Sequence, residues 1–332
     1  MSSIVVAPPR PRTRAAGVTR VYLPACAIAA LAVGLVAYGV ATGWDGASFG
    51  GSATALRVTI AGPLALTFLV AFLVIERVWP AQRRSPFARG YRQDLLYALL
   101  HATILVPFMT ALTLASVALV LDVAPWIVLP HLGAVPRWLA IAAIVVAMDA
   151  CNWLVHLANH RVRMLWRFHE LHHSQEDMSV LTVFRTHPLI HVSYLVALLP
   201  VVVLLANGVM GTTVLVFYGA MVALAHSNTR LGFGRLERIF VSPNYHRIHH
   251  RLDGRQDVNL GFALTIWDRL AGLAVFPTAA TVRIDTGLPG RPLVVEQEGP
   301  RARHLAVLGR QLVAPFRPMD DDPVDEHEVT AS

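Results

Sequence analysis

Eight histidines in the middle of the chain form three short clusters whose spacing suits metal binding. They are His156-x3-His160, His169-x2-His172-His173 and His246-x2-His249-His250. Side chains three and four residues apart share one face of a helix. Imidazole is a ligand for iron, zinc, copper or nickel rather than for magnesium or calcium. Eight imidazoles exceed the needs of one tetrahedral ion and suit two, so we predict a di-metal site.

Two such sites need one or two ligands beyond these eight. We favour His226, which ends an apolar segment, and His187, which precedes the start of another. His191 is interpreted as a spare or supporting residue, and the histidines at 101, 131, 304 and 327 are placed outside the site.

A carboxylate lies on the same helical face as the first cluster. Asp149, Trp153, His156 and His160 follow one another at steps of four, three and four residues. Metal-bound imidazoles usually donate their second N–H to a carboxylate or a carbonyl. We therefore expect Asp149 to support a ligand histidine in this way.

The composition indicates a membrane protein. The chain of 332 residues is 55% hydrophobic and 15% charged. Its net charge of +7 comes from arginines that flank apolar segments, which favours membrane topology over nucleic-acid binding. Two cysteines provide neither a disulfide framework nor a zinc site. Segments long enough to span, or nearly so, lie at 21–43, 54–76, 95–121, 138–157, 189–206 and 209–226.

The arginines predict which side of the membrane the clusters face. The basic tail 1–20 and the 77–92 loop are expected in the cytoplasm, because positive loops stay inside. Counting spans from there places all three clusters and both termini on the cytoplasmic side.

The predicted fold is an all-α integral membrane protein with about four to six transmembrane helices and a cytoplasmic helical cap that carries the di-metal site. We divide it into a basic tail (1–20), N-terminal transmembrane helices (21–137), a catalytic domain (138–276) and a polar, partly disordered tail (277–332).

Residues 149–271 resemble the fatty acid hydroxylase superfamily, also called the sterol desaturase family. The resemblance rests on the first cluster with Asp149 and Trp153, on FHELHHS at 168–174, RTHPL at 185–189, AHSN at 225–228, SPNYHRIHH at 242–250 and NLGFALTIWDRLAGL at 259–273. Only eight residues separate His160 from His169, which favours hydroxylases over membrane acyl desaturases. The family's N-Y-G reads Asn259-Leu260-Gly261 here, and the arginine after the first box histidine is Leu157.

The resemblance implies an integral membrane enzyme with two iron ions that uses O2 to hydroxylate or desaturate an apolar lipid, such as a fatty acyl chain or a sterol. The eight box histidines would be the ligands, His187 and His226 match further family histidines, and Asn259 would support the site. No other catalytic residue is expected.

The chain carries no flavin, haem or nucleotide motif, so we expect electrons from an external donor: a cytochrome b5-like protein, a ferredoxin or a reductase. The alternatives are a metal transporter and a non-catalytic membrane protein that binds metal or lipid. A transporter would place its ligands near the bilayer midplane, whereas these lie at the interface and beyond.

Overall fold

The part of the chain that the structure describes is helical and contains no strand. This computed structural model describes residues 62–83, 90–127, 136–195, 212–288 and 301–317. Its α-helices are α3 (Gly62–Val78), α4 (Tyr91–Leu100), α5 (Val106–Val123), α6 (Arg137–Arg161), α7 (Arg163–His173), α9 (Thr212–His226), α10 (Pro243–His249), α11 (Ile266–Leu270) and α12 (Arg301–Val313). Three isolated β-bridges join loops.

Within the described residues, one helix is long and apolar enough to cross a membrane. It is the stretch Ile141–Arg161 of α6, which contains most of the predicted span 138–157. The predicted spans 54–76, 189–206 and 209–226 lie partly outside the described residues, and the tail 1–20 and the span 21–43 lie wholly outside them. The all-helical prediction is thus confirmed for the described residues, and the number of spans stays a prediction.

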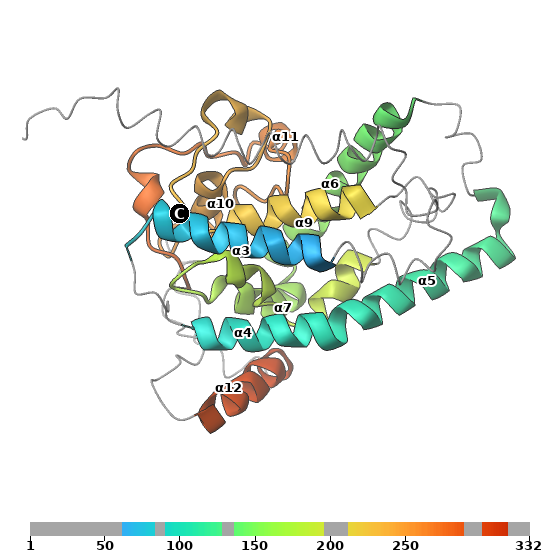
Figure 1. Ribbon diagram of the computed structural model, residues 1–332, viewed down its shortest axis with the longest axis horizontal. Coiled ribbons are helices and arrows are strands. Elements are labelled where there is room, and N and C mark those ends of the chain that lie inside the picture. Colours follow the sequence, from blue (N-terminus) through green and yellow to red (C-terminus); the bar gives the residue numbers. More distant parts are fainter. Residues whose placement is uncertain (1–61, 84–89, 128–135, 196–211, 289–300, 318–332) are drawn as a thin grey trace, which may run out of the picture.

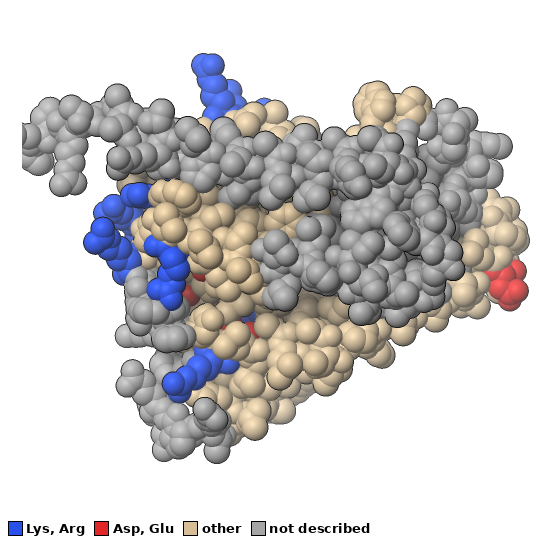
Figure 2. Space-filling view, viewed as in Figure 1, with Lys and Arg blue, Asp and Glu red and all other residues tan. Residues whose placement is uncertain are grey.

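The predicted span 95–121 falls on a long helical rod. A π-helical segment, His101–Leu105, joins α4 to α5, and the three run on as one rod along one side of the molecule (Figure 1). Large apolar side chains are exposed along α5, among them Phe108 and Leu119, and Ile104 is exposed just before this helix. Figure 2 shows the same contrast: charges gather near the end of α3, and little of the described surface along α5 is charged. Such a surface suits contact with lipid.

The core forms where α3, α9 and the short 3-10 segment Val180–Phe184 meet. Phe68 and Phe72 of α3 pack there with Val180, Leu181 and Leu224. In Figure 1, α3 and α9 run side by side above α7. This packing fixes the C-terminal end of α9, which carries His226.

A buried ion pair fastens the chain after α7 to the start of α4. Nε of Arg185 lies 2.5 Å from Oδ1 of Asp94, and both side chains are almost fully buried. The amide of Gln175 donates to the other oxygen of Asp94 at 2.6 Å. An unpaired buried charge is costly, so these partners determine how the segment 174–186 lies against α4.

Part of the segment that the sequence placed in a partly disordered tail is helical. α12 (Arg301–Val313) lies against α4 (Figure 1) and buries His304, Val307 and Gln311 along one face. The hydroxyl of Tyr97 in α4 donates to Oε1 of Gln311 at 3.1 Å. The sequence pattern missed this helix because its buried stripe is short and mixes polar with apolar residues. Residues 318–332 lie outside the described part of the chain.

Candidate metal centre

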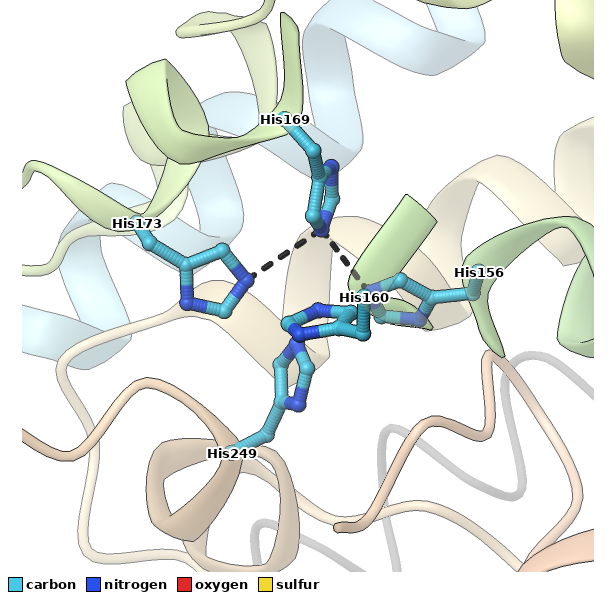
Figure 3. Close-up of side chains that lie close together, drawn as sticks. All are labelled: His156, His160, His169, His173 and His249. Atoms are coloured by element: carbon cyan, nitrogen blue, oxygen red, sulfur yellow. Dashed lines mark hydrogen bonds between the residues drawn. The ribbon is translucent and has the colours of Figure 1, made fainter. Parts of the chain in front are cut away.

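Nine histidines converge from four helices into two adjacent groups. The first group contains His156, His160, His169, His173 and His249, and the second contains His172, His226, His246 and His250. Within each group the nitrogens that could bind a metal all lie within 4.8 Å of one another. Figure 3 shows the rings of the first group pointing to a common centre.

Helical spacing explains how the clusters divide between the groups. Residues four apart lie on the same face, and the pairs 156/160 and 169/173 accordingly belong to the first group, whereas 246/250 belongs to the second. The remaining histidine of each H-x-x-H-H cluster crosses over, so His172 joins the second group and His249 the first. Each group therefore draws on both α7 and α10, which holds the two groups side by side.

Backbone carbonyls orient three of these rings. Nδ1 of His156 lies 2.8 Å from the carbonyl oxygen of Leu260, and Nδ1 of His249 lies 2.9 Å from that of Val258. Nδ1 of His226 lies 2.7 Å from the carbonyl oxygen of Val222. A carbonyl only accepts, so each Nδ1 donates and each Nε2 keeps its lone pair for a metal.

The loop that supplies two of these carbonyls is built around Asn259. Its φ of 56° lies in the left-handed region, which asparagine tolerates better than most residues. Its side-chain amide donates to the carbonyls of Tyr245 and Val275 at 2.9 and 2.8 Å. Its neighbours Val258 and Leu260 can therefore direct their carbonyls to histidines of two different clusters.

Asp149 holds the same loop rather than a histidine. Its carboxylate accepts hydrogen bonds from the hydroxyl of Tyr218, the backbone N–H groups of Ala263 and Leu264, and the indole of Trp267, at 2.7 to 3.1 Å. No hydrogen bond joins it to a histidine of either group within the described residues. In the described part of the chain, Asp149 and Asn259 thus contact the candidate ligand histidines only through the loop 258–264.

A second buried carboxylate, Asp268, was not singled out from the sequence as a site residue. It accepts from the indole of Trp153 at 2.8 Å, the backbone N–H groups of Leu260 and Gly261 at 2.9 Å and the hydroxyl of Tyr245 at 3.0 Å. It therefore ties α6, α10 and the loop together. The available signal in the sequence was the Trp267-Asp268 pair within the segment 259–273, but the pair alone does not reveal these four partners.

The spacing of the imidazole nitrogens is short enough for neighbouring rings to bind the same metal ion. Neighbouring Nε2 atoms lie 2.9 to 3.2 Å apart, as in the pairs His156–His169 and His172–His226. Two nitrogens at about 2.1 Å from one metal are about 3.0 Å apart at a right angle and about 3.4 Å apart at the tetrahedral angle. Buried Nε2 atoms of His160 and His249 also lack a hydrogen-bond partner. The residues present therefore fit a metal ion in each of the two groups.

Burial keeps these imidazoles neutral. It lowers the pKa values of His172, His246 and His250 well below the ordinary value, and the neighbouring imidazoles lower them further. Metals bind the neutral form of imidazole, so the ligands are ready at neutral pH.

We expect the metal-free protein to lose stability in mild acid. In the unfolded chain these histidines take up protons as the pH falls through about 6.5, whereas in the folded protein they stay neutral. The unfolded state then binds more protons, so the free energy of unfolding decreases as the pH falls below about 6.5. Melting temperatures of the metal-free protein across this range measure the effect. A melting temperature that stays constant or rises on acidification contradicts it, and metal-loaded protein, whose ligands resist protonation, is the control.

The structure places His187 apart from both groups. Its Nε2 lies 3.0 Å from the carbonyl oxygen of Leu312, and its Nδ1 accepts from the N–H of Leu189 at 3.2 Å. Its ring also packs against Phe168 and Phe316. These contacts join the segment before residue 190 to the end of α12, and they leave neither ring nitrogen for a metal.

We therefore expect His187→Ala to keep its metal and His226→Ala to lose metal. Removing the His187 ring leaves the carbonyl of Leu312 without this donor, which should lower the melting temperature by a few degrees. Metal analysis of the two purified variants, with thermal melts, tests this pair. Loss of metal from His187→Ala at an unchanged melting temperature would contradict the assignment.

An apolar cavity of about 820 Å³ opens onto both groups. Its lining includes His156 and His169 of the first group and His172, His226 and His246 of the second. Most of the remaining wall is apolar, including Phe68, Met148, Val183, Ile190, Ala223 and Phe262. The volume lies within the range of small-molecule sites. The candidate metal centre thus forms the polar wall of a cavity suited to an apolar molecule.

These features define the class of protein: a helical protein in which two groups of histidines form part of the wall of an apolar cavity. Residues 141–273 match the family model of the fatty acid hydroxylases. This part of the chain is a fatty acid hydroxylase domain, and the resemblance predicted from the histidine motifs is confirmed.

Curated proteins of related sequence are lipid-modifying enzymes. The chain is 32% identical to the ornithine lipid hydroxylase OlsE of Rhizobium tropici over 144 residues, which are 42% of each chain. It is 27% identical to the alkylglycerol monooxygenase of Danio rerio over 168 residues, 49% of this chain and 36% of that one. It is 30% identical to the human alkylglycerol monooxygenase over 129 residues, 38% of this chain and 28% of that one. The chain thus spans less than half the length of these relatives. No solved structure matches it.

Proposed function

We propose that the protein is a di-iron, O2-dependent enzyme that hydroxylates or desaturates an apolar lipid. The observation that carries this proposal is the apolar cavity whose wall contains histidines of both candidate metal groups. The names of the relatives, an ornithine lipid hydroxylase and alkylglycerol monooxygenases, support a lipid as substrate and hydroxylation as the reaction.

The donor set of the first group suits iron better than zinc. The first group offers five imidazoles and the second four, whereas zinc usually takes four ligands in all. The proposed ligands are His156, His160, His169, His173 and His249 for one ion and His172, His226, His246 and His250 for the other. His187 is left out of this set because both its ring nitrogens are engaged elsewhere.

Hydroxylation places one oxygen atom of O2 into a C–H bond and reduces the other to water with two electrons and two protons. Bound iron would supply the activation of O2, which no protein side chain can perform. As the source of the electrons we propose an external donor of the cytochrome b5, ferredoxin or reductase type.

The protein's own residues hold the ions and shape the space beside them. Phe262 packs against the ring of His156 with centroids 5.2 Å apart and lines the cavity. Tyr218 stacks on Phe262 and is fixed by Asp149. These contacts place aromatic side chains beside the first group, where the cavity could admit a carbon chain.

We also propose that the chain lies in a membrane with the histidine groups on its cytoplasmic side. The apolar stretch Ile141–Arg161 and the arginines near the end of α3 support this. A topology reporter fused after Asp253 should read as cytoplasmic. A reporter that reads as external overturns the orientation without affecting the proposed chemistry.

The test of the function combines metal analysis with product detection. Purified protein should contain two iron ions, and membranes containing it should add labelled oxygen to a lipid when supplied with 18O2 and a reductant system. Comparing lipid extracts of cells with and without the gene identifies the substrate. Stoichiometric zinc that iron cannot replace, in a protein that still transforms its lipid, would overturn the di-iron proposal.

A further inference from the structure

Three polar side chains of the cavity wall belong to neither histidine group and lie against one another. Nε2 of His191 is 3.0 Å from the hydroxyl oxygen of Thr186. The rings of His191 and His101 meet edge to face, with centroids 4.7 Å apart. All three residues line the cavity. We refer to His101, Thr186 and His191 as the polar cluster.

The backbone at His101 is unusual in a way that bears on the cluster. His101 begins the π-helical segment His101–Leu105, and the N–H of Val106, five residues on, donates to its carbonyl. In Figure 1 this segment lies where α4 passes into α5. A π-helical turn inserts one residue into the helix and changes which side chain faces inward, and such turns often occur at functional sites. At this turn the side chain that lines the cavity is the imidazole of His101, which packs against Phe184.

The polar cluster has hydrogen-bonding capacity that the described residues do not use. A neutral imidazole offers one donor and one acceptor, and His101 makes no hydrogen bond within the described part of the chain. The wall residues Asn152, Tyr194 and Tyr218 are already engaged: Asn152 donates to the hydroxyl of Tyr218, and Asn159, which is not part of the wall, donates to that of Tyr194. His101 is partly buried and lines the cavity, so its unused donor and acceptor are available to a molecule bound there.

The absence of charged side chains from the described wall limits what that ligand can be. None of the described residues that line the cavity is Asp, Glu, Lys or Arg. A charged group held at the polar cluster would lose its hydration without gaining a side chain of opposite charge. The cavity therefore suits an apolar chain with an uncharged polar group such as a hydroxyl, an amide or an ester carbonyl.

We propose that the polar cluster binds an uncharged hydrogen-bonding group of the lipid and thereby determines which carbon of the chain lies at the histidine groups. This rests on the proposed function, because it assumes that the occupant of the cavity is the substrate. It assigns a positioning role to His101, which the sequence analysis placed outside the site, and to His191, which it interpreted as a spare or supporting residue.

Ligand binding to the purified, metal-loaded protein in detergent tests the proposal without any turnover. The probes are octadecanol, octadecane and stearate, which share a chain length and differ only in the end group. Bound probe is quantified by mass spectrometry. The wild-type protein should prefer octadecanol to octadecane about tenfold, the contribution of one or two net hydrogen bonds, and should also prefer it to stearate.

Substitutions within the cluster should remove this preference. We expect His101→Phe to bind both uncharged probes equally and His101→Gln, which keeps a donor and an acceptor, to restore much of the discrimination. Thr103→Val is the matched control, because Thr103 lies on the same π-helical segment, is exposed and does not line the cavity. Thr186→Val provides a second cluster variant if His101→Phe does not fold. All variants should retain their metal.

A preference for octadecanol that is unchanged in His101→Phe and Thr186→Val overturns the proposal, as does tighter binding of stearate by the wild type. A protein that shows the expected preference but never oxidises a lipid would overturn the proposed function and leave the polar cluster as a binding site.

Discussion

His249→Ala and His172→Ala are each expected to lose one of two metal ions and almost all turnover. The two variants address different groups, because His249 belongs to the first and His172 to the second. Both side chains are buried, so no water-exposed group can replace them. Substituting residues that merely support a metal ligand costs about 10- to 100-fold in metal affinity or activity. Removing a ligand should therefore cost more than about 100-fold.

Metal analysis and lipid oxidation, measured on the same preparations, test this. The matched control is His304→Ala, which removes a buried histidine of α12 that belongs to neither group. It should retain both ions. If His249→Ala and His172→Ala keep two ions each, the two groups are not the metal sites. If each variant loses both ions, the sites fill cooperatively rather than independently.

The sequence predicted which histidines converge better than it predicted how they divide into two groups. Spacing in three clusters identified eight of the nine histidines that converge, because residues on one helical face must point the same way. Spacing within a cluster cannot show that His172 and His249 cross to the other group, since this depends on how α7 and α10 pack. His226 and His187 gave equal signals as single histidines beside apolar segments. Only the packing of α9 and of α12 distinguishes them.

The supports of the centre were the least predictable part. Asp149 was expected to accept a hydrogen bond from a ligand histidine, yet its partners are the loop and two aromatic side chains rather than an imidazole. The carbonyls that orient His156 and His249 come from residues about 100 and 9 positions away, respectively. Every residue has a carbonyl, so no pattern of residue types marks those that serve a ligand. The sequence signal for this loop was Asn259, which the family resemblance had named as a supporting residue.

Asp268→Ala is expected to destabilise the protein severely and to release metal from the first group. Burial raises the pKa of the Asp268 carboxyl, and its four donors lower it. Each of those donors, on Trp153, Tyr245, Leu260 and Gly261, would lose its acceptor. A buried donor left without a partner costs about 1–3 kcal/mol, so four should cost several kcal/mol together, a large part of the stability of a typical domain.

The loss of these hydrogen bonds should also weaken metal binding, because two of the donors lie close to the candidate ligand histidines. Leu260 carries the carbonyl that orients His156, and Tyr245 precedes the third cluster directly. Thermal melts and metal content of Asp268→Ala are to be compared with those of Asp253→Ala. Asp253 is exposed and its contact with Arg251 is a surface pair, so its removal should cost no more than about 1 kcal/mol. Asp268→Asn, which keeps one acceptor oxygen and adds a donor that faces other donors, should fall between the two. A melting temperature of Asp268→Ala equal to that of Asp253→Ala, with metal retained, would show that the loop holds its position without this carboxylate.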